Sequence, residues 1–168
     1  MVLMEIHQIP LLRSPIMVIA CGGWSDAGEA ATGTISHLLN TVGNHANDAL
    51  STGELIAEID SEDYYDFQVN RPYIRIDETV VREIIWPNTV FYAVNTPNLN
   101  NDFLIVKGIE PSMRWPTFAN QILEIADDYE VNTVITLGAL LADTPHSRPI
   151  TVTASGAHPD IAKRLGVE

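Results

Sequence analysis

Short apolar runs alternate with helix-like patterns along the chain. Residues 16–20 form an unbroken apolar run, which predicts a strand buried on both faces. From 27 to 39 the small and apolar residues recur in steps of three and four, which predicts an amphipathic helix with Asp26 as its cap. The apolar stripe from 115 to 129 predicts a second helix, and Pro116 suits its first turn.

The remaining apolar segments are strand-sized. Their composition predicts further strands at 54–59, 72–76, 89–94, 103–106, 131–137 and 149–153, and a short helix is predicted at 160–165. Apolar strands that alternate with amphipathic helices predict an α/β fold in three layers, with a mostly parallel central sheet and helices on both faces. Because we find no repeat, low-complexity tract or linker, residues 1–168 are expected to form a single α/β domain.

The charge balance of the chain excludes several classes of partner. There are 22 acidic and 9 basic side chains, which gives a formal net charge of −13. This charge argues against binding to nucleic acid or to an anionic membrane surface. The longest apolar runs are too short to cross a membrane, and the residues around Glu5 lack the basic stretch of a secretion signal. One cysteine suits a reducing compartment, so a cytoplasmic location is expected.

Unusual polar and aromatic residues gather in four loops that follow predicted strands, at 22–26, 95–98, 108–114 and 142–148. Ligands of open α/β sheets bind outside the carboxyl ends of the strands, so parallel strands would place all four loops on one rim. Trp24 is hard to bury between a glycine and a helix cap, and is the favoured interface candidate. The predicted interface or rim residues are Trp24, Glu110, Ser112, Arg114 and Trp115. Trp115 is also expected to close one end of the core.

Catalytic interpretations of these loops stay open beside structural ones. The glycines before the first helix could present amide groups to a phosphate, or could simply form a capped turn in which Asp26 takes those donors. Ser25, His146 and Asp143 have the residue types of a catalytic triad, yet no GxSxG motif is present. An enzyme would use Asp26, Asp143, His146 and Arg148 for acid–base and anion-binding roles.

Metal and cofactor binding are not expected. The histidines and the single cysteine share no metal-ligand spacing. The acidic residues between 54 and 66 could attract Ca²⁺, but they lack the EF-hand pattern and are more typical of a solvated face. We therefore predict no metal site and no cofactor.

Four segments resemble a known family when they are read in order. They are 23–31, 65–68 with Arg71-Pro72, 108–115 and 137–149. Together they resemble the family of the second proteasome assembly chaperone, most of all its bacterial, actinobacterial-type branch. The resemblance implies a fold related to the purine nucleoside phosphorylase-like arrangement, self-association, and, in eukaryotic and archaeal relatives, binding to proteasome α-subunits. The family has no established catalytic residues, so none is implied here.

The resemblance also implies two differences from other members. Members of this branch are longer, so this chain is expected to be the N-terminal part of a longer family fold. Several assembly chaperones dock through a C-terminal hydrophobic–tyrosine–any tail, whereas this sequence ends in Gly166-Val167-Glu168. The leading hypothesis is a non-enzymatic, homo-oligomeric binding protein with proteasome α-subunits as candidate partners. The alternative is a small-molecule phosphorylase or hydrolase with its site at the carboxyl ends of the strands.

Overall fold

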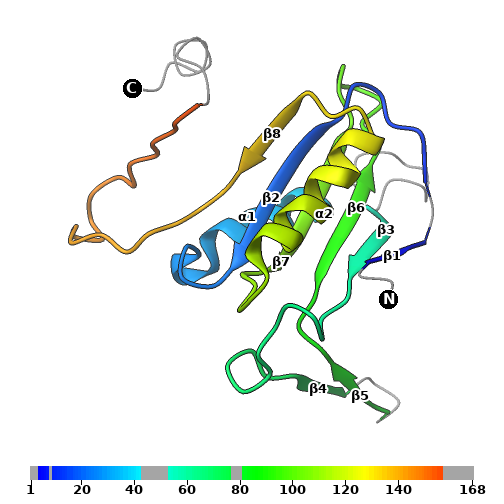
Figure 1. Ribbon diagram of the computed structural model, residues 1–168. Helices are drawn as coiled ribbons and strands as arrows, with labels where there is room; N and C mark the ends of the chain where they lie inside the picture. The colour runs from blue at the N-terminus through cyan, green and yellow to red at the C-terminus, as the bar shows by residue number, and fades with distance from the viewer. Residues whose placement is uncertain (1–3, 8, 43–52, 77–80, 157–168) are drawn as a thin grey trace.

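A six-stranded mixed sheet forms the centre of the computed structural model, which describes residues 4–7, 9–42, 53–76 and 81–156 (Figure 1). The strand order is β1-β3-β6-β7-β2-β8. The strands of this sheet are β1 (Met4–Ile6), β2 (Ile16–Gly22), β3 (Glu54–Ile59), β6 (Thr89–Val94), β7 (Phe103–Ile109) and β8 (Thr133–Thr136). Two helices are described, α1 (Ala30–Val42) and α2 (Trp115–Asp128), and neither is long and apolar enough to cross a membrane.

The sheet is parallel in one half and antiparallel in the other. β2 runs parallel to β7 and to β8, as expected. In contrast, β6 is antiparallel to β7 and β3, and β3 is antiparallel to β1, so the expectation of a mostly parallel sheet holds only for β7-β2-β8. The physical reason is the length of the connections: residues 95–102 join β6 to β7, and a parallel crossover needs about a dozen residues or more.

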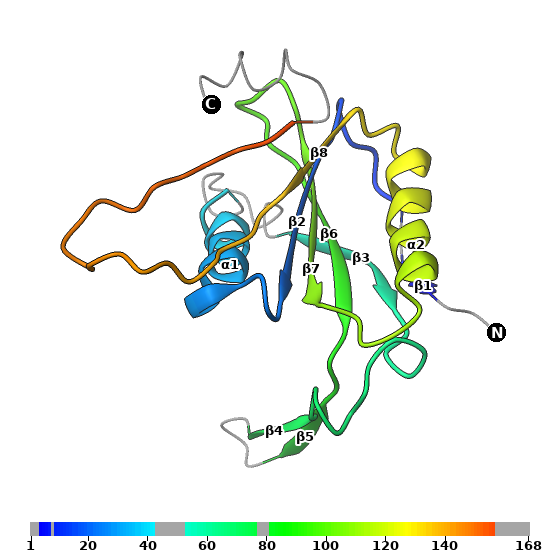
Figure 2. The ribbon, with the colours of Figure 1, turned by 60° about the vertical axis from the view of Figure 1, so that its left-hand side comes forward.

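The two helices cover opposite faces of the sheet, which gives the three expected layers (Figure 2). Successive side chains of β2 alternate between these faces. Met17 belongs to the core cluster that includes Phe118 of α2, whereas Val18 packs in the cluster that includes Ile35 of α1. A strand buried on both faces has no polar side to show, which is why residues 16–20 are apolar without interruption.

The first helix begins later than the sequence pattern predicts. Residues Ala27–Glu29 form a 3₁₀ turn, because Gly28 has a left-handed φ of 64°, and the α-helix starts at Ala30. Asp26 still caps this helix: its carboxylate accepts hydrogen bonds from the amides of Ala31 at 2.7 Å and Thr32 at 3.2 Å. The prediction that Asp26 caps the helix is therefore confirmed, but the α-helix begins four residues after Asp26 and not directly after it.

The last predicted elements differ from the structure. Residues 149–153 were expected to form a strand, but they form exposed, extended chain without strand pairing in the described residues. They follow β8 in a long segment that projects from the sheet (Figure 1). The helix predicted at 160–165 lies outside the described residues.

A separate β-hairpin lies outside the main sheet. The predicted strand at 72–76 becomes β4 (Tyr73–Ile76), which pairs antiparallel with β5 (Arg82–Ile85). The hairpin projects from the body at the same end of the molecule as the ends of β2 and β7 (Figures 1 and 2). β5 was not predicted, because Arg82 and Glu83 interrupt its apolar pattern.

Candidate functional site

The carboxyl ends of four strands meet at one edge of the sheet, which we call the rim. β2, β7 and β8 are parallel, and β3 runs in the same direction because it is antiparallel to β6, which is antiparallel to β7. The loop at 95–98 was predicted to join this rim and lies at the opposite edge. There the Thr96 amide donates to Asp102, which also binds Arg13 in front of β2. The prediction failed because β6 runs against its neighbours.

Glu110 joins the loop after β2 to the loop after β7. Its carboxylate accepts a 2.5 Å hydrogen bond from the Ser25 hydroxyl and a 3.3 Å bond from the Trp24 amide. Its own amide donates to the carbonyl of Gly22 at 2.9 Å. Gly23 has a φ of 148°, and a Cβ there would lie 2.8 Å from Glu110 Oε2. The turn is therefore fixed by hydrogen bonds and admits only glycine at its centre.

This fixed turn presents Trp24 to solvent. The Trp24 side chain is 83% exposed, which is unusual for the largest apolar side chain. Two more exposed apolar side chains lie nearby in sequence after β7: Met113 in the loop before α2, at 45%, and Trp115, the first residue of α2, at 53%. The expectation that Trp115 closes the core is wrong, because Phe118 and Ile122 are the buried residues of α2 at that end.

The segment after β3 also belongs to the rim and was not among the four loops predicted from the sequence. The Ser112 amide donates to the carbonyl of Tyr64 at 2.8 Å, and the Ser112 hydroxyl accepts from the Asp66 amide at 3.1 Å. Arg114, which has a left-handed φ of 55°, pairs with Asp63. The direction of β3 was the signal that could have placed this segment, and it depends on pairing that a single sequence does not reveal.

Asp26 serves as a helix cap in this arrangement. Besides the two amides of α1, its carboxylate accepts a 2.5 Å bond from the Thr32 hydroxyl. Burial acts to raise the pKa of Asp26, but the bonds from Thr32 and Ala31 outweigh burial and lower it. Because Asp26 occupies the amides that an anion would need, the capped-turn interpretation accounts for this loop and the phosphate-binding one does not.

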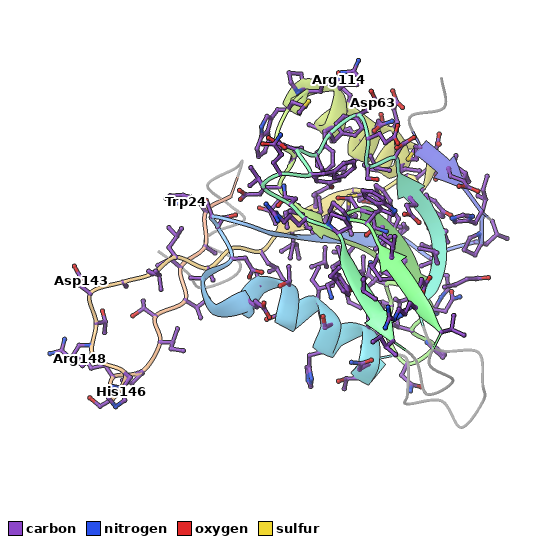
Figure 3. The ribbon with its side chains drawn as sticks, turned by 90° about the horizontal axis from the view of Figure 1, so that it is seen from below. Trp24, Asp63, Arg114, Asp143, His146 and Arg148 are labelled. Atoms are coloured by element: carbon purple, nitrogen blue, oxygen red, sulfur yellow. The ribbon has the colours of Figure 1, made fainter. Side chains whose placement is uncertain are left out.

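The structure does not bring the other acid–base candidates to the rim. Asp143, His146 and Arg148 lie at the outer end of the exposed segment after β8, away from Trp24 (Figure 3). His146 has no hydrogen-bond partner among the described residues, and Ser25 is bonded to Glu110 instead. The triad of Ser25, His146 and Asp143 that the residue types suggested is therefore not assembled in the described part of the chain.

In the described residues, neither Cys21 nor the acidic side chains have the features of a reactive thiol or of a group of metal ligands. Burial, with the nearby charges of Glu110 and Asp26, raises the pKa of the Cys21 thiol to about 11, so it stays protonated at neutral pH. In the ranges that the structure describes, no group of three or more histidine, cysteine or acidic side chains could hold a metal ion.

The sequence and fold are similar to those of known proteins. The sequence model of the PAC2 family matches residues 20–168. A PAC2 family protein from Streptomyces avermitilis is 44% identical with a TM-score of 0.79, over 92% of this chain and 62% of its own. A proteasome-assembly chaperone homologue from Mycobacterium tuberculosis is 40% identical with a TM-score of 0.77, over 91% of this chain and 61% of its own.

A more distant protein shows the fold alone. It comes from Corynebacterium glutamicum and is 22% identical, with a TM-score of 0.72, over 98% of this chain and 69% of its own. No curated protein matches this chain. The chain thus spans about three fifths of the length of the two more similar structures. Because the family's sequence model matches nearly all of the chain, and the two more similar structures are at least 40% identical to it where they match, this chain belongs to the PAC2 family.

Proposed function

We propose that this chain is a non-enzymatic, homo-oligomeric binding protein of the assembly-chaperone type, which binds proteasome α-subunits through its rim. Membership of the PAC2 family supports a chaperone-like role. The similarity to a mycobacterial proteasome-assembly chaperone homologue supports proteasome subunits as the class of partner. The interface residues we propose are Trp24, Glu110, Ser112, Arg114 and Trp115.

The exposed Trp24 on its fixed turn is the observation that favours this proposal most. An indole that is 83% exposed gains much by burial against a partner, and tryptophan is enriched among residues that dominate binding energy. Its backbone is already held by Glu110, so little conformational entropy is lost when a partner binds. Glu110 and Ser112 thus act by positioning, whereas Trp24, Arg114 and Trp115 would touch the partner.

Three further features belong to the same proposal. A chaperone of proteasome subunits would work in the cytoplasm. The three layers are compatible with the purine nucleoside phosphorylase-like relationship that the family resemblance implies.

We also propose that residues 1–168 are the N-terminal part of a longer fold. The greater length of the relatives supports this, as does β8, an edge strand in which Val134 is 45% and Ile135 is 43% exposed.

The enzyme alternative has less support. Asp26 serves α1 as its cap, and Asp143, His146 and Arg148 stand in an exposed segment. A surface hollow is lined by Glu5, Glu58, Asp60 and Ser61, and three carboxylates would repel phosphate. A phosphorylase would need the opposite charge at its site.

The proposal is tested by measuring the affinity of the purified chain for proteasome α-subunits of its own host. Trp24→Ala should weaken binding about 5-fold or more, which corresponds to about 1 kcal/mol. Leu11→Ala is the control, because Leu11 is 94% exposed and precedes β2 at the opposite edge. If wild-type protein does not bind, α-subunits are the wrong partner; if Trp24→Ala binds as tightly as Leu11→Ala, the rim is the wrong surface.

Native mass spectrometry of the tagged protein from its own host tests the class of function more broadly. It reports the oligomeric state and any retained partner in one measurement. Stoichiometric α-subunits would support the chaperone role. A homo-oligomer that retains a small ligand and no protein partner would contradict it and favour the enzyme alternative.

A further inference from the structure

The β4–β5 hairpin carries an apolar face that the rest of the described chain leaves uncovered. Ile74 pairs with Ile84, and Ile76 pairs with Arg82. Because side chains alternate between the two faces of a strand, these four residues share one face of the hairpin. Ile74, Ile76 and Ile84 are 60%, 58% and 57% exposed, and we call them the isoleucine face.

This face is an unusual feature for an isolated hairpin. A two-stranded sheet is marginally stable in water unless another layer covers its apolar side. The hairpin extends from the body, and neither helix reaches it (Figures 1 and 2). Trp86, two residues beyond Ile84, is 47% exposed and rests on Phe67 with ring centroids 4.8 Å apart. Contiguous exposed apolar residues of this kind mark interaction surfaces.

The charge distribution favours a second copy of this chain as the occupant. Residues 71–86 contain three arginines and three acidic residues, so their net charge is 3 − 3 = 0, in a chain with a net charge of −13. Two copies repel each other over most of their surfaces, and this repulsion is weakest where neutral segments meet. A basic partner protein would instead be drawn to the acidic surfaces elsewhere. The hairpin is therefore better suited to self-association than to an oppositely charged partner.

We propose that two copies associate through their isoleucine faces about a two-fold axis. This inference rests on the self-association within the proposed function and assigns it a surface distinct from the rim. Two small sheets would pack face to face, as the layers of a sandwich do. If the two-fold axis runs parallel to the line that joins Ile74 to its partner Ile84, then Ile74 and Ile84 of one copy face Ile74 and Ile84 of the other copy. This axis also places Arg82 at the tip of one hairpin over Trp86 at the base of the other, a favourable cation–aromatic pair.

Sedimentation velocity over a range of protein concentrations tests this inference. Wild-type protein should change from the 18.5 kDa chain to a species of twice that mass as its concentration rises. Ile84→Glu should raise the dimer dissociation constant about tenfold or more, because it buries a charge against isoleucine. Ile150→Glu is the matched control: Ile150 is 92% exposed in the segment after β8, and this variant should associate like the wild type.

Two single-cysteine variants distinguish a loss of association from a loss of the hairpin's fold. In a Cys21→Ser background, Ile74→Cys should form a disulfide-linked dimer on mild oxidation, because each Ile74 faces its own copy across the axis. Tyr73→Cys should not, because Tyr73 is 62% exposed on the opposite face of the same strand. Equal cross-linking of the two variants would overturn the proposed packing.

The remaining outcomes distinguish this inference from the proposed function. A wild-type chain that stays monomeric at every concentration overturns the inference, whereas binding of α-subunits to the rim can still be measured. If Trp24→Ala abolishes the dimer and Ile84→Glu does not, self-association uses the rim and the inference is wrong. If Ile84→Glu instead abolishes binding of α-subunits to a monomer, the isoleucine face serves that partner, and the inference is again wrong.

Discussion

The hydroxyl of Ser25 donates a 2.5 Å hydrogen bond to the carboxylate of Glu110, and this contact joins two loops that lie far apart in the sequence. Trp24 lies next to Ser25 and donates its amide to the same carboxylate. The exposed indole thus stands on a backbone that is held from two sides. Hydrogen bonds to a charged acceptor are stronger than neutral ones, so Glu110 is the main support of this turn.

Removing this support should destabilise the protein measurably. We expect Glu110→Ala to lower the free energy of unfolding by about 1–2 kcal/mol, because three donors lose a charged acceptor that is only partly exposed. Urea denaturation followed by circular dichroism measures this change. Glu124→Ala on the exposed side of α2 is the control and should lie within about 0.5 kcal/mol of the wild type. Equal effects of the two variants would show that Glu110 does not support the turn.

Two glycine substitutions should change stability in opposite directions. Gly23→Ala should cost about 2 kcal/mol or more, because φ is 148° and the new Cβ would lie 2.8 Å from Glu110 Oε2. Gly33→Ala should stabilise the protein by about 0.5–1 kcal/mol, because Gly33 lies in α1 and nothing lies within 4 Å of the added Cβ. Thermal unfolding of both variants checks the pair, and a stable Gly23→Ala protein would contradict the geometry of the turn.

The sequence was sufficient for the elements of the core but not for their directions. β2 was predictable because an unbroken apolar run indicates a strand that is buried on both faces. α2 was predictable because apolar residues in steps of three and four indicate a helix with one buried side. The direction of β6 was not, because strands buried on both faces are equally apolar in parallel and antiparallel sheets. The only local signal was the short connection at 95–102, which is too short for a crossover.

The site was predictable in its residues more than in its contacts. Trp24 and Glu110 stood out as an aromatic residue and a carboxylate in loops after strands. Their hydrogen bond depends on the parallel register of β2 and β7, which pairs Gly22 with Ile109 and which one sequence does not reveal. The contact of Ser112 with Tyr64 was missed for the same reason, since it requires the direction of β3. The outward direction of Trp115 follows from the start of α2 directly after the left-handed Arg114.

The pair of Arg13 and Asp102 should make stability depend on pH. Burial acts to raise the pKa of Asp102, but hydrogen bonds from Arg13 and Thr96 outweigh it and lower the pKa to about 2. A carboxyl with a lowered pKa in the folded state stabilises the protein above its ordinary pKa, and this contribution is lost as the pH falls from about 4 to about 2. The shift corresponds to about 2 kcal/mol.

Asp102→Asn isolates this contribution from that of the other acidic residues. At neutral pH the variant should be less stable than the wild type, because Asp102 is fully buried and binds Arg13 through both oxygens. Urea titrations at decreasing pH should show this difference in unfolding free energy shrinking by about 2 kcal/mol between about pH 4 and about pH 2. A difference that is constant with pH would mean that Asp102 titrates alike in the folded and unfolded chains.

Cys21 should react slowly with alkylating reagents. Its thiol lies at the carboxyl end of β2, where burial first, and then the charges of Glu110 and Asp26, raise its pKa from 9.0 to about 11. Since the thiolate is the reactive form, a shift of this size makes alkylation about a hundredfold slower near pH 8 than for an exposed cysteine of ordinary pKa. Labelling with iodoacetamide, followed by mass spectrometry of the intact protein, measures the rate.

Because the charge of Glu110 contributes to the raised pKa of Cys21, Glu110→Ala should react faster than the wild type under conditions where both stay folded, whereas Glu124→Ala should not. A wild-type rate equal to that of a small-molecule thiol of ordinary pKa would show that Cys21 is open to solvent at the end of β2 and that its pKa is not raised.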